Sequence, residues 1–256
     1  MTATLPVGSW KTALSPGYSI RLARDPGEVL SAQALRFEVF NLEMNEGLIE
    51  SYATGLDADP FDPVCDHLIV LELASGLVVG TYRLQTGAGA AGNLGYYSAQ
   101  EFELDAWEPY RDELIELGRA CIHPDHRNAF VLGLLWKGIA SYANRCGARY
   151  LFGCSSITSQ DPAEGASVYS ALCRSHLAPY PWRTRPKTEF ECSLEELADE
   201  TPKIPKLLRA YLSLGAKICG PPALDRAFGT IDFLTILDLD RLPALTKRRF
   251  FSQSMA

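Results

Sequence analysis

A glutamate and an arginine lie three positions apart in a stretch that otherwise has the composition of a buried β-strand, Glu116-Leu-Gly-Arg119-Ala-Cys. Successive side chains of a strand point to opposite faces of a sheet. Alternation therefore places Glu116 and Gly118 on one face and Leu117 and Arg119 on the other, unless a bulge interrupts the pleat. Burying either charge costs free energy unless the charge is paired or functional. The strand thus carries either a structural ion pair or part of a functional site.

Three other groups have residue types that suggest chemistry, and each has a simpler interpretation. Residues 87–92 (GAGAAG) fit a GxGxxG pattern, but no amphipathic helix follows, so the pattern favours a flexible loop over a nucleotide site. Residues 123–126 (HPDH) have no third ligand group nearby in the sequence, which favours a surface turn before a helix over a metal site. Cys65 and Cys154 have no base motif beside them, so they are interpreted as inert buried thiols. We predict neither a metal nor a bound cofactor.

The composition is that of a folded globular protein. The 256 residues are 47% hydrophobic, which supplies a substantial core and excludes an intrinsically disordered chain. The longest apolar run, residues 129–143, is shorter than a membrane span and contains Lys137. The first ten residues do not have the pattern of a signal peptide. Seven cysteines without a CxxC pair fit a reduced, cytoplasmic protein better than a disulfide scaffold.

Charge is distributed unevenly along the chain. Residues 1–113 contain 6 Lys and Arg against 17 Asp and Glu, whereas residues 114–256 contain 18 against 14. The acidic half suggests a site for cations and the basic half an anionic partner, although uneven surface composition explains the same counts. A pI of about 5.2 argues against nucleic acid as a partner.

Hydrophobic periodicity and turn residues predict an α/β fold with a mixed sheet flanked by helices. The predicted strands cover residues 18–23, 67–73, 77–85, 114–122, 150–155 and 231–237. The predicted helices cover residues 28–44, 129–146, 162–175 and 204–214, followed by a short basic helical tail. We divide the chain into an N-terminal segment (1–17), a core (18–190) and a C-terminal extension (191–256) that packs on the core.

Several segments in a fixed order resemble the acyl-homoserine-lactone synthases, a branch of the GNAT acyltransferase fold. The segments are LRFEVF at 35–40, DPFD at 59–62, GTYRL at 80–84 and ELGR at 116–119. A sister group, the ornithine N-acyltransferases that make lyso-ornithine lipid and are often labelled hemolysins, is more similar still. Its segments are CDHL at 65–68, ELGRACIHP at 116–124, LWKGIA at 135–140, YLFGCSS at 150–156 and residues 208–215 with GPPALD at 220–225.

The resemblance implies amide formation between a fatty acyl thioester and the α-amine of an amino acid. An ammonium must lose a proton before it attacks, and a carboxylate such as Glu116 can accept that proton. A backbone N–H near Gly118 could stabilise the oxyanion, with Arg119 beside it, and the thiolate leaves without a covalent acyl-enzyme. We therefore assign Glu116, Gly118 and Arg119 to catalysis.

The resemblance also implies separate sites for the acceptor and the donor. The expected acceptor-binding residues combine aspartates that could read a second amine with arginines that could grip a carboxylate or hold those aspartates: Arg36, Asp59, Asp62, Asp66 and Arg83. The expected donor-binding residues lie on the two central strands and the turn after the first: Ala120, Cys121, Ile122, Arg127 and Ser155.

The expected donor is a 3-hydroxyacyl chain on acyl carrier protein, and the expected acceptor is L-ornithine. GNAT enzymes that use CoA place glycines where a strand turns into its helix, whereas this chain has Phe130 and Leu132 at those positions. Glycine, lysine, glutamine or an aromatic amino acid remains an alternative acceptor. A non-enzymatic, membrane-lytic protein is an alternative of another class. The basic tail at residues 247–251 (KRRFF) would allow a peripheral contact with the inner face of the membrane in either case.

Overall fold

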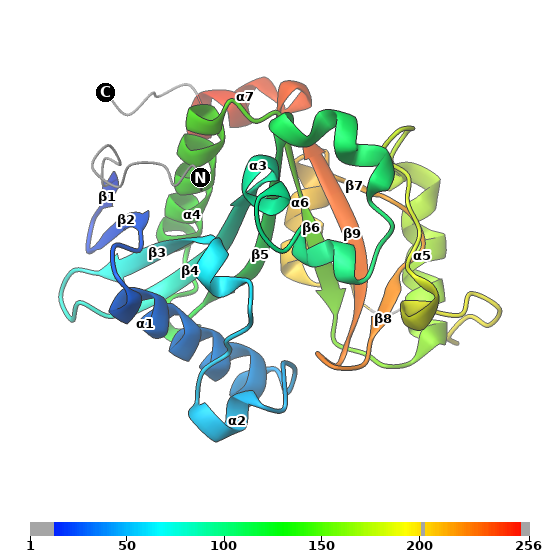
Figure 1. The fold of residues 1–256 in the computed structure, drawn as a ribbon, viewed down its shortest axis with the longest axis horizontal. Coiled ribbons are helices and arrows are strands. Elements are labelled where there is room, and N and C mark those ends of the chain that lie inside the picture. Colours follow the sequence, from blue (N-terminus) through cyan, green and yellow to red (C-terminus); the bar gives the residue numbers. More distant parts are fainter. Residues whose placement is uncertain (1–12, 201–202, 252–256) are drawn as a thin grey trace.

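A single nine-stranded mixed sheet organises the protein, as the computed structural model shows for residues 13–200 and 203–251 (Figure 1). Its strands run in the order β1-β2-β3-β4-β5-β6-β9-β7, and β8 pairs with β9 beside this path. Neighbouring strands are antiparallel except for β5 and β6, which are parallel. The first half of the sheet forms a meander, and the chain crosses over through a helix before β6.

The strands have the following bounds: β1 Ala13–Ser15, β2 Tyr18–Leu22, β3 Asp66–Glu72, β4 Val78–Thr86, β5 Leu114–Ile122, β6 Tyr150–Ile157, β7 Lys217–Ile218, β8 Ala223–Asp225 and β9 Thr230–Asp238. The α-helices have the following bounds: α1 Pro26–Phe37, α2 Ser51–Thr54, α3 Gly87–Ala91, α4 Ala129–Cys146, α5 Pro162–His176, α6 Lys206–Ser213 and α7 Ala244–Thr246.

Helices cover both faces of the sheet. Helix α4 packs its apolar side on Ile20, Leu68 and Leu84, while α5 and α6 pack on Phe233 and its neighbours along the same face. Helix α1 and the segment between β4 and β5 cover the opposite face, where α1 contributes Leu35. The charged residues of the predicted site lie mainly on this second face, so α1 is the helix that encloses them.

Most predicted elements are confirmed within a few residues, including the GNAT-like mixed sheet. The bounds of β5 and α4 agree with the prediction, and Gly147 ends α4 in the left-handed region with φ 66°. The predicted turn at residues 123–126 is confirmed as a short 3-10 helix, Pro124–His126. The residues assigned to a C-terminal extension supply α6 and strands β7 to β9 of the common sheet.

The glycine-rich segment was predicted to be a flexible loop, and this prediction is wrong. Residues Gly87–Ala91 form helix α3, and the Thr86 hydroxyl caps it by accepting a hydrogen bond from Gly89 N at 3.0 Å. A Cβ at Gly87 would lie 2.1 Å from the Arg111 carbonyl oxygen, so the glycine permits a close backbone approach. The small residues of α3 therefore allow the close packing of this helix against its neighbours.

Helix α1 also differs from the prediction, because it ends at Phe37 instead of continuing to Met44. Residues Glu38–Glu43 continue the turn as a π-helix. The hydrophobic period of the sequence does not distinguish the wider turn, since Val39 and Phe40 are buried in either geometry.

The basic tail, Lys247–Phe251, is helical as predicted, but its aromatic rings face the protein. Phe250 and Phe251 pack against the core beneath α4, with the Phe250 ring centroid 6.3 Å from that of Trp136. Within residues 13–200 and 203–251, no helix combines the length and apolar character needed to cross a bilayer.

Candidate active site

Strands β5 and β6 separate in the middle of the sheet and open a cleft. Their parallel pairing covers Leu114–Glu116 and Tyr150–Phe152 and ends there. A Cβ at Gly153 would lie 2.0 Å from the Leu117 carbonyl oxygen, so glycine is needed where the strands part. The cleft is lined by Gly118, Arg119, Ala120, Cys154 and Ser155, together with Leu207 and Tyr211 of α6. The predicted residues Gly118, Arg119, Ala120 and Ser155 thus meet at one opening.

A β-bulge lies in β5 at the mouth of this cleft. Opposite Tyr82 of β4 the strand contains two residues, Arg119 and Ala120, because Thr81 pairs with Cys121 and Arg83 with Gly118. Arg119 has φ 50°, a left-handed conformation that is unusual for a non-glycine residue. The bulge reverses the alternation and turns the Arg119 side chain to the face occupied by Glu116.

Glu116 is buried and is held by backbone amides rather than by an arginine. Its Oε2 accepts a hydrogen bond from Tyr97 N at 2.7 Å, and its Oε1 accepts one from Ser98 N at 2.6 Å. These amides begin the 3-10 helix Tyr97–Gln100. Burial raises the pKa of the Glu116 carboxyl, although the bonds from Ser98 and Tyr97 and the charge of Arg83 oppose the rise. A carboxylate with a raised pKa suits proton transfer near neutral pH.

Arg36 connects α1 to the aspartate-rich loop. Its Nε donates to Asp57 Oδ2 at 2.9 Å, and its two terminal nitrogens donate to both carboxylate oxygens of Asp62 at 2.9 Å. Burial alone would raise the pKa of Asp62, but the hydrogen bonds and charge of Arg36 outweigh it and hold the pKa far below its ordinary range. Arg36 is fully buried. It lies in the last turn of α1, where the helix period places it on the buried side of the helix.

Arg83 and Arg119 complete this ion-pair network. Arg83 Nη1 donates to Asp59 Oδ1 at 2.6 Å and to Asp62 Oδ1 at 3.0 Å, while Arg119 Nη2 donates to Asp59 Oδ2 at 3.0 Å. Both guanidinium groups lie 5.0 Å from the centroid of the Tyr97 ring. Asp57, which the sequence interpretation did not single out, lies 3.6 Å from Arg119 Nε. The three arginines therefore hold the three aspartates. This geometry favours arginines that fix the aspartates in place over arginines that bind a carboxylate of the acceptor.

Four other predicted residues do not join this group. Asp66 lies on the opposite face of the sheet, where its Oδ2 accepts a hydrogen bond from the Tyr142 hydroxyl at 2.7 Å. Cys121 packs under α1 with Leu35, and Ile122 packs with the core beneath α4. Arg127 forms an exposed ion pair with Glu43. Asp66 and Ile122 thus point to the face beneath α4 and Cys121 points beneath α1, while Arg127 lies beyond the end of β5, after the short 3-10 helix.

Comparisons with known proteins agree with this geometry. The chain is 35% identical over 239 residues to the L-ornithine N(alpha)-acyltransferase of Brucella abortus (strain 2308), covering 87% of this chain and 85% of the relative. It is 33% identical over 232 residues to the L-ornithine N(alpha)-acyltransferase of Rhodobacter capsulatus, covering 86% and 90%. The chain belongs to this family. A GNAT acetyltransferase domain model matches residues 35–137.

Solved structures show the same fold. FeeM, an N-acyl amino acid synthase from uncultured soil microbes, superposes with a TM-score of 0.52 at 15% identity over 93% of this chain and 99% of that one. The AHL synthase LasI superposes with a TM-score of 0.50 at 13% identity over 91% of this chain and 94% of that one. The protein is therefore an acyltransferase with a GNAT fold, as the sequence resemblance implied.

The two cysteines considered as nucleophiles are poorly suited to that role. Burial raises the pKa of the Cys65 thiol to about 12 and the pKa of Cys154 well above its ordinary value. A thiol must ionise to attack an acyl group, so both sulfurs are weak nucleophiles near neutral pH.

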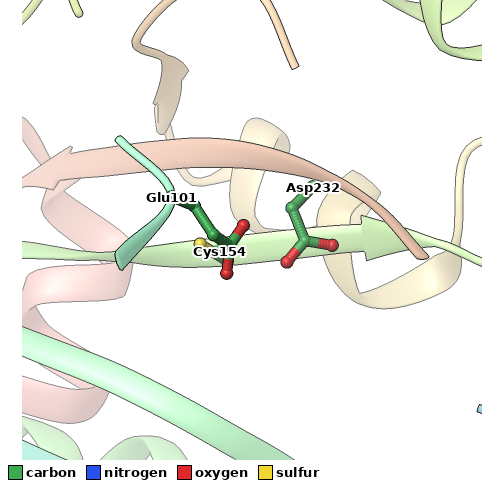
Figure 2. A group of neighbouring side chains, drawn as sticks. All are labelled: Glu101, Cys154 and Asp232. Carbon is green, nitrogen blue, oxygen red and sulfur yellow. The ribbon is translucent and has the colours of Figure 1, made fainter. Parts of the chain in front are cut away.

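A second group of carboxylates near the cleft was missed by the sequence interpretation. Glu101 follows the 3-10 helix Tyr97–Gln100, and Asp232 lies on β9; their carboxyl groups gather over Cys154 of β6 (Figure 2). One ligand atom from each of the three residues lies within 4.8 Å of the others. The residues are far apart in the sequence and share no motif, so only the fold reveals the group.

Proposed function

We propose that the protein transfers a 3-hydroxyacyl chain from acyl carrier protein to the α-amine of L-ornithine, forming lyso-ornithine lipid. The observation that carries this proposal is the cleft between β5 and β6, which opens directly after Glu116, the last residue of β5 that pairs with β6 and one whose carboxylate is buried. Membership in the ornithine acyltransferase family supports the acceptor. The apolar cleft walls formed by Leu207 and Tyr211 suit a fatty acyl chain.

In this mechanism the thioester lies in the cleft with its carbonyl carbon near the bulge. Glu116 accepts the proton of the acceptor's ammonium, directly or through water, and the free amine attacks the carbonyl. Backbone N–H groups around Gly118, where β5 has left β6, stabilise the oxyanion that forms. The intermediate collapses by breaking the C–S bond, and the pantetheine thiolate takes up the proton that the attacking nitrogen loses as the amide forms.

The start of α4 favours a carrier protein over CoA as the donor. Asn128 caps this helix, and its Oδ1 accepts hydrogen bonds from Phe130 N at 2.9 Å and Val131 N at 3.1 Å. The amides that a pyrophosphate would use are therefore already bonded. The Phe130 side chain is 59% exposed and would obstruct the approach of a nucleotide. A pantetheine arm with a single phosphodiester needs fewer such amides.

Exposed basic residues of the second half of the chain would face the acidic carrier. Two of these basic residues, Arg127 and Arg149, form ion pairs with Glu43 and with Asp238. Lys137 on α4 and Arg185 are exposed. Contacts of this kind raise the association rate and are weakened by salt.

The decisive experiment supplies purified protein with L-ornithine and the same 3-hydroxyacyl chain on either acyl carrier protein or CoA. We expect acyl-ornithine by mass spectrometry, a lower KM for the carrier-bound donor, and a donor KM that rises as salt increases from about 0.05 to 0.5 M. Equal efficiency with CoA and no salt dependence would contradict the donor. An expressing host should gain a new aminolipid, whereas lysis of red cells without a new lipid would favour the lytic alternative.

A further inference from the structure

Two carboxylates beside the cleft are buried without a hydrogen-bonding partner for one oxygen each. Glu101 and Asp232 are 2% and 5% exposed. Glu101 Oε2 and Asp232 Oδ1 accept no hydrogen bond from any residue within 13–200 and 203–251. Figure 2 shows the two carboxyl groups facing the same space. A buried, unsatisfied carboxylate oxygen is costly, so two at one place indicate that a positively charged group belongs between them.

The charged groups around this pair leave it with excess negative charge. Asp225, whose Oδ1 accepts hydrogen bonds from the amides of Ala227 and Phe228, adds a further negative charge near both carboxylates. Glu46 is close enough to Asp232 for that charge to raise the Glu46 pKa. Arg119 is a cation whose charge reaches both, but its guanidinium is committed to Asp59 and to the Tyr97 hydroxyl.

The pair lies next to the proposed catalytic carboxylate. Ser98 links the two sites, because its backbone N–H donates to Glu116 Oε1 at 2.6 Å and Cys154 Sγ lies 3.5 Å from its hydroxyl oxygen. Cys154 in turn contributes an atom to the group with Glu101 and Asp232. An acceptor whose α-amine lies beside Glu116 can therefore extend its own side chain toward the pair.

We propose that Glu101 and Asp232 bind the side-chain ammonium of the acceptor and so select a diamino acid. This inference rests on the proposed function and names the residues that read the second amine. An ammonium nitrogen forms charge-assisted hydrogen bonds of about 2.7–2.9 Å, so one nitrogen can bridge two carboxylate oxygens less than 4.8 Å apart. This assignment replaces Asp59 and Asp62, whose oxygens are occupied by arginines.

The test compares L-ornithine with L-norvaline, which has the same carbon chain without the terminal amine. The wild-type protein should acylate ornithine with a kcat/KM at least tenfold above that for norvaline. Glu101→Gln and Asp232→Asn should lower kcat/KM for ornithine by about 10- to 100-fold, mainly through KM, because each removes a hydrogen bond between charged groups. The value for norvaline should stay within a factor of about three. Glu103→Gln, at an exposed position two residues away, is the matched control.

Other outcomes separate this inference from the proposed function. A wild-type protein that acylates both amino acids equally, or variants that lose activity equally on both, would overturn the ammonium site while leaving acyl transfer intact. A stoichiometric metal in the purified protein that is lost in Asp232→Asn would also overturn it, in favour of a metal site. Acylation of neither amino acid would overturn the proposed function itself. Equal acylation of the two acceptors by the wild-type protein would overturn the site even if a variant failed to fold.

Discussion

Arg119 and Glu116 both contact the segment that begins at Tyr97, although strict alternation would place them on opposite faces of β5. Glu116 accepts the Tyr97 amide, and the Arg119 guanidinium lies over the Tyr97 ring with Nη2 3.3 Å from its hydroxyl. The bulge at Arg119 and Ala120 produces this arrangement, and it lies just beyond the point where the pairing of β5 with β6 ends. One backbone irregularity therefore brings a guanidinium to the face of the carboxylate, beside the cleft mouth.

Glu116→Gln tests the proton acceptor. We expect kcat to fall by roughly 10²–10⁴, because an amide does not accept a proton near neutral pH. For the wild-type protein, kcat/KM should rise with pH through a pKa above the ordinary 4.5 of a glutamate, since burial raises it and the base must be ionised. This rise is measured in a pH–rate profile.

The control for this variant concerns folding, because both oxygens of Glu116 accept backbone amides. Glutamine places an NH₂ group against one of those amides, so a modest fall in Tm is expected. Glu116→Asp keeps the carboxylate on a shorter arm and should retain more activity than glutamine. If both variants turn over at near wild-type rates, Glu116 is not the base.

Asp62→Asn tests the network that Arg36 organises. It removes a buried ionic partner from Arg36 and Arg83, so the free energy of unfolding should fall by about 3–5 kcal/mol. The KM for the acceptor should change little in the protein that remains folded. Denaturant titration measures the first quantity, and Asp105→Asn at an exposed position is the control. A raised acceptor KM with unchanged stability would instead favour a direct role in binding the amine.

The sequence predicts the elements of this fold better than it predicts which residues meet. Hydrophobic periodicity and the glycine at position 147 predict α4 with its ends, because both signals are local. The face to which Arg119 points depends on a bulge that no residue in the local sequence predicts. The residue with positive φ in this bulge is Arg119 itself and not the neighbouring Gly118. Asp57 and Asp59 both bind arginines. The sequence motif contains Asp59, whereas the role of Asp57 becomes visible only in the folded loop. Glu101 and Asp232 meet only because β9 lies beside β6.

Two glycines at the cleft should respond differently to alanine. A Cβ at Gly153 would collide with the Leu117 carbonyl oxygen, so Gly153→Ala should displace β6 from β5 and lower Tm. A Cβ at Gly118 meets no atom within 4 Å, so Gly118→Ala should fold normally and act on the donor KM or kcat through the cleft it lines. Thermal unfolding and donor kinetics on both variants distinguish the effects. Equal loss of stability would show that the strands do not part where we place the opening.

The buried carboxylates predict how stability depends on pH in the absence of substrate. Burial raises the pKa of Asp232 from 3.8 to about 6 and raises that of Glu101 as well. Below about pH 4 such a carboxyl group is protonated in both the folded and the unfolded protein and does not lower the free energy of unfolding. As pH rises from about 4 to about 6, the group ionises in the unfolded chain before it ionises in the fold, so stability falls, and the loss is complete above about pH 6. Asp59 and Asp62 act in the opposite sense: their pKa values are held below 3.8, so their contribution is present above about pH 4 and is lost in more acid solution.

Stability should therefore be greatest near about pH 4 and fall as pH rises to about 6, and Asp232→Asn should show the reason. The amide has no charge to bury, so the variant should have a higher Tm than the wild-type protein at about pH 7.5 and a much smaller advantage at about pH 4.5. Thermal unfolding at the two pH values measures this difference. An identical Tm difference at both would mean that asparagine acts through packing rather than through charge. L-Ornithine at pH 7.5 should raise the Tm of the wild-type protein more than L-norvaline does, because only ornithine supplies the missing cation, and binding to the folded state stabilises it.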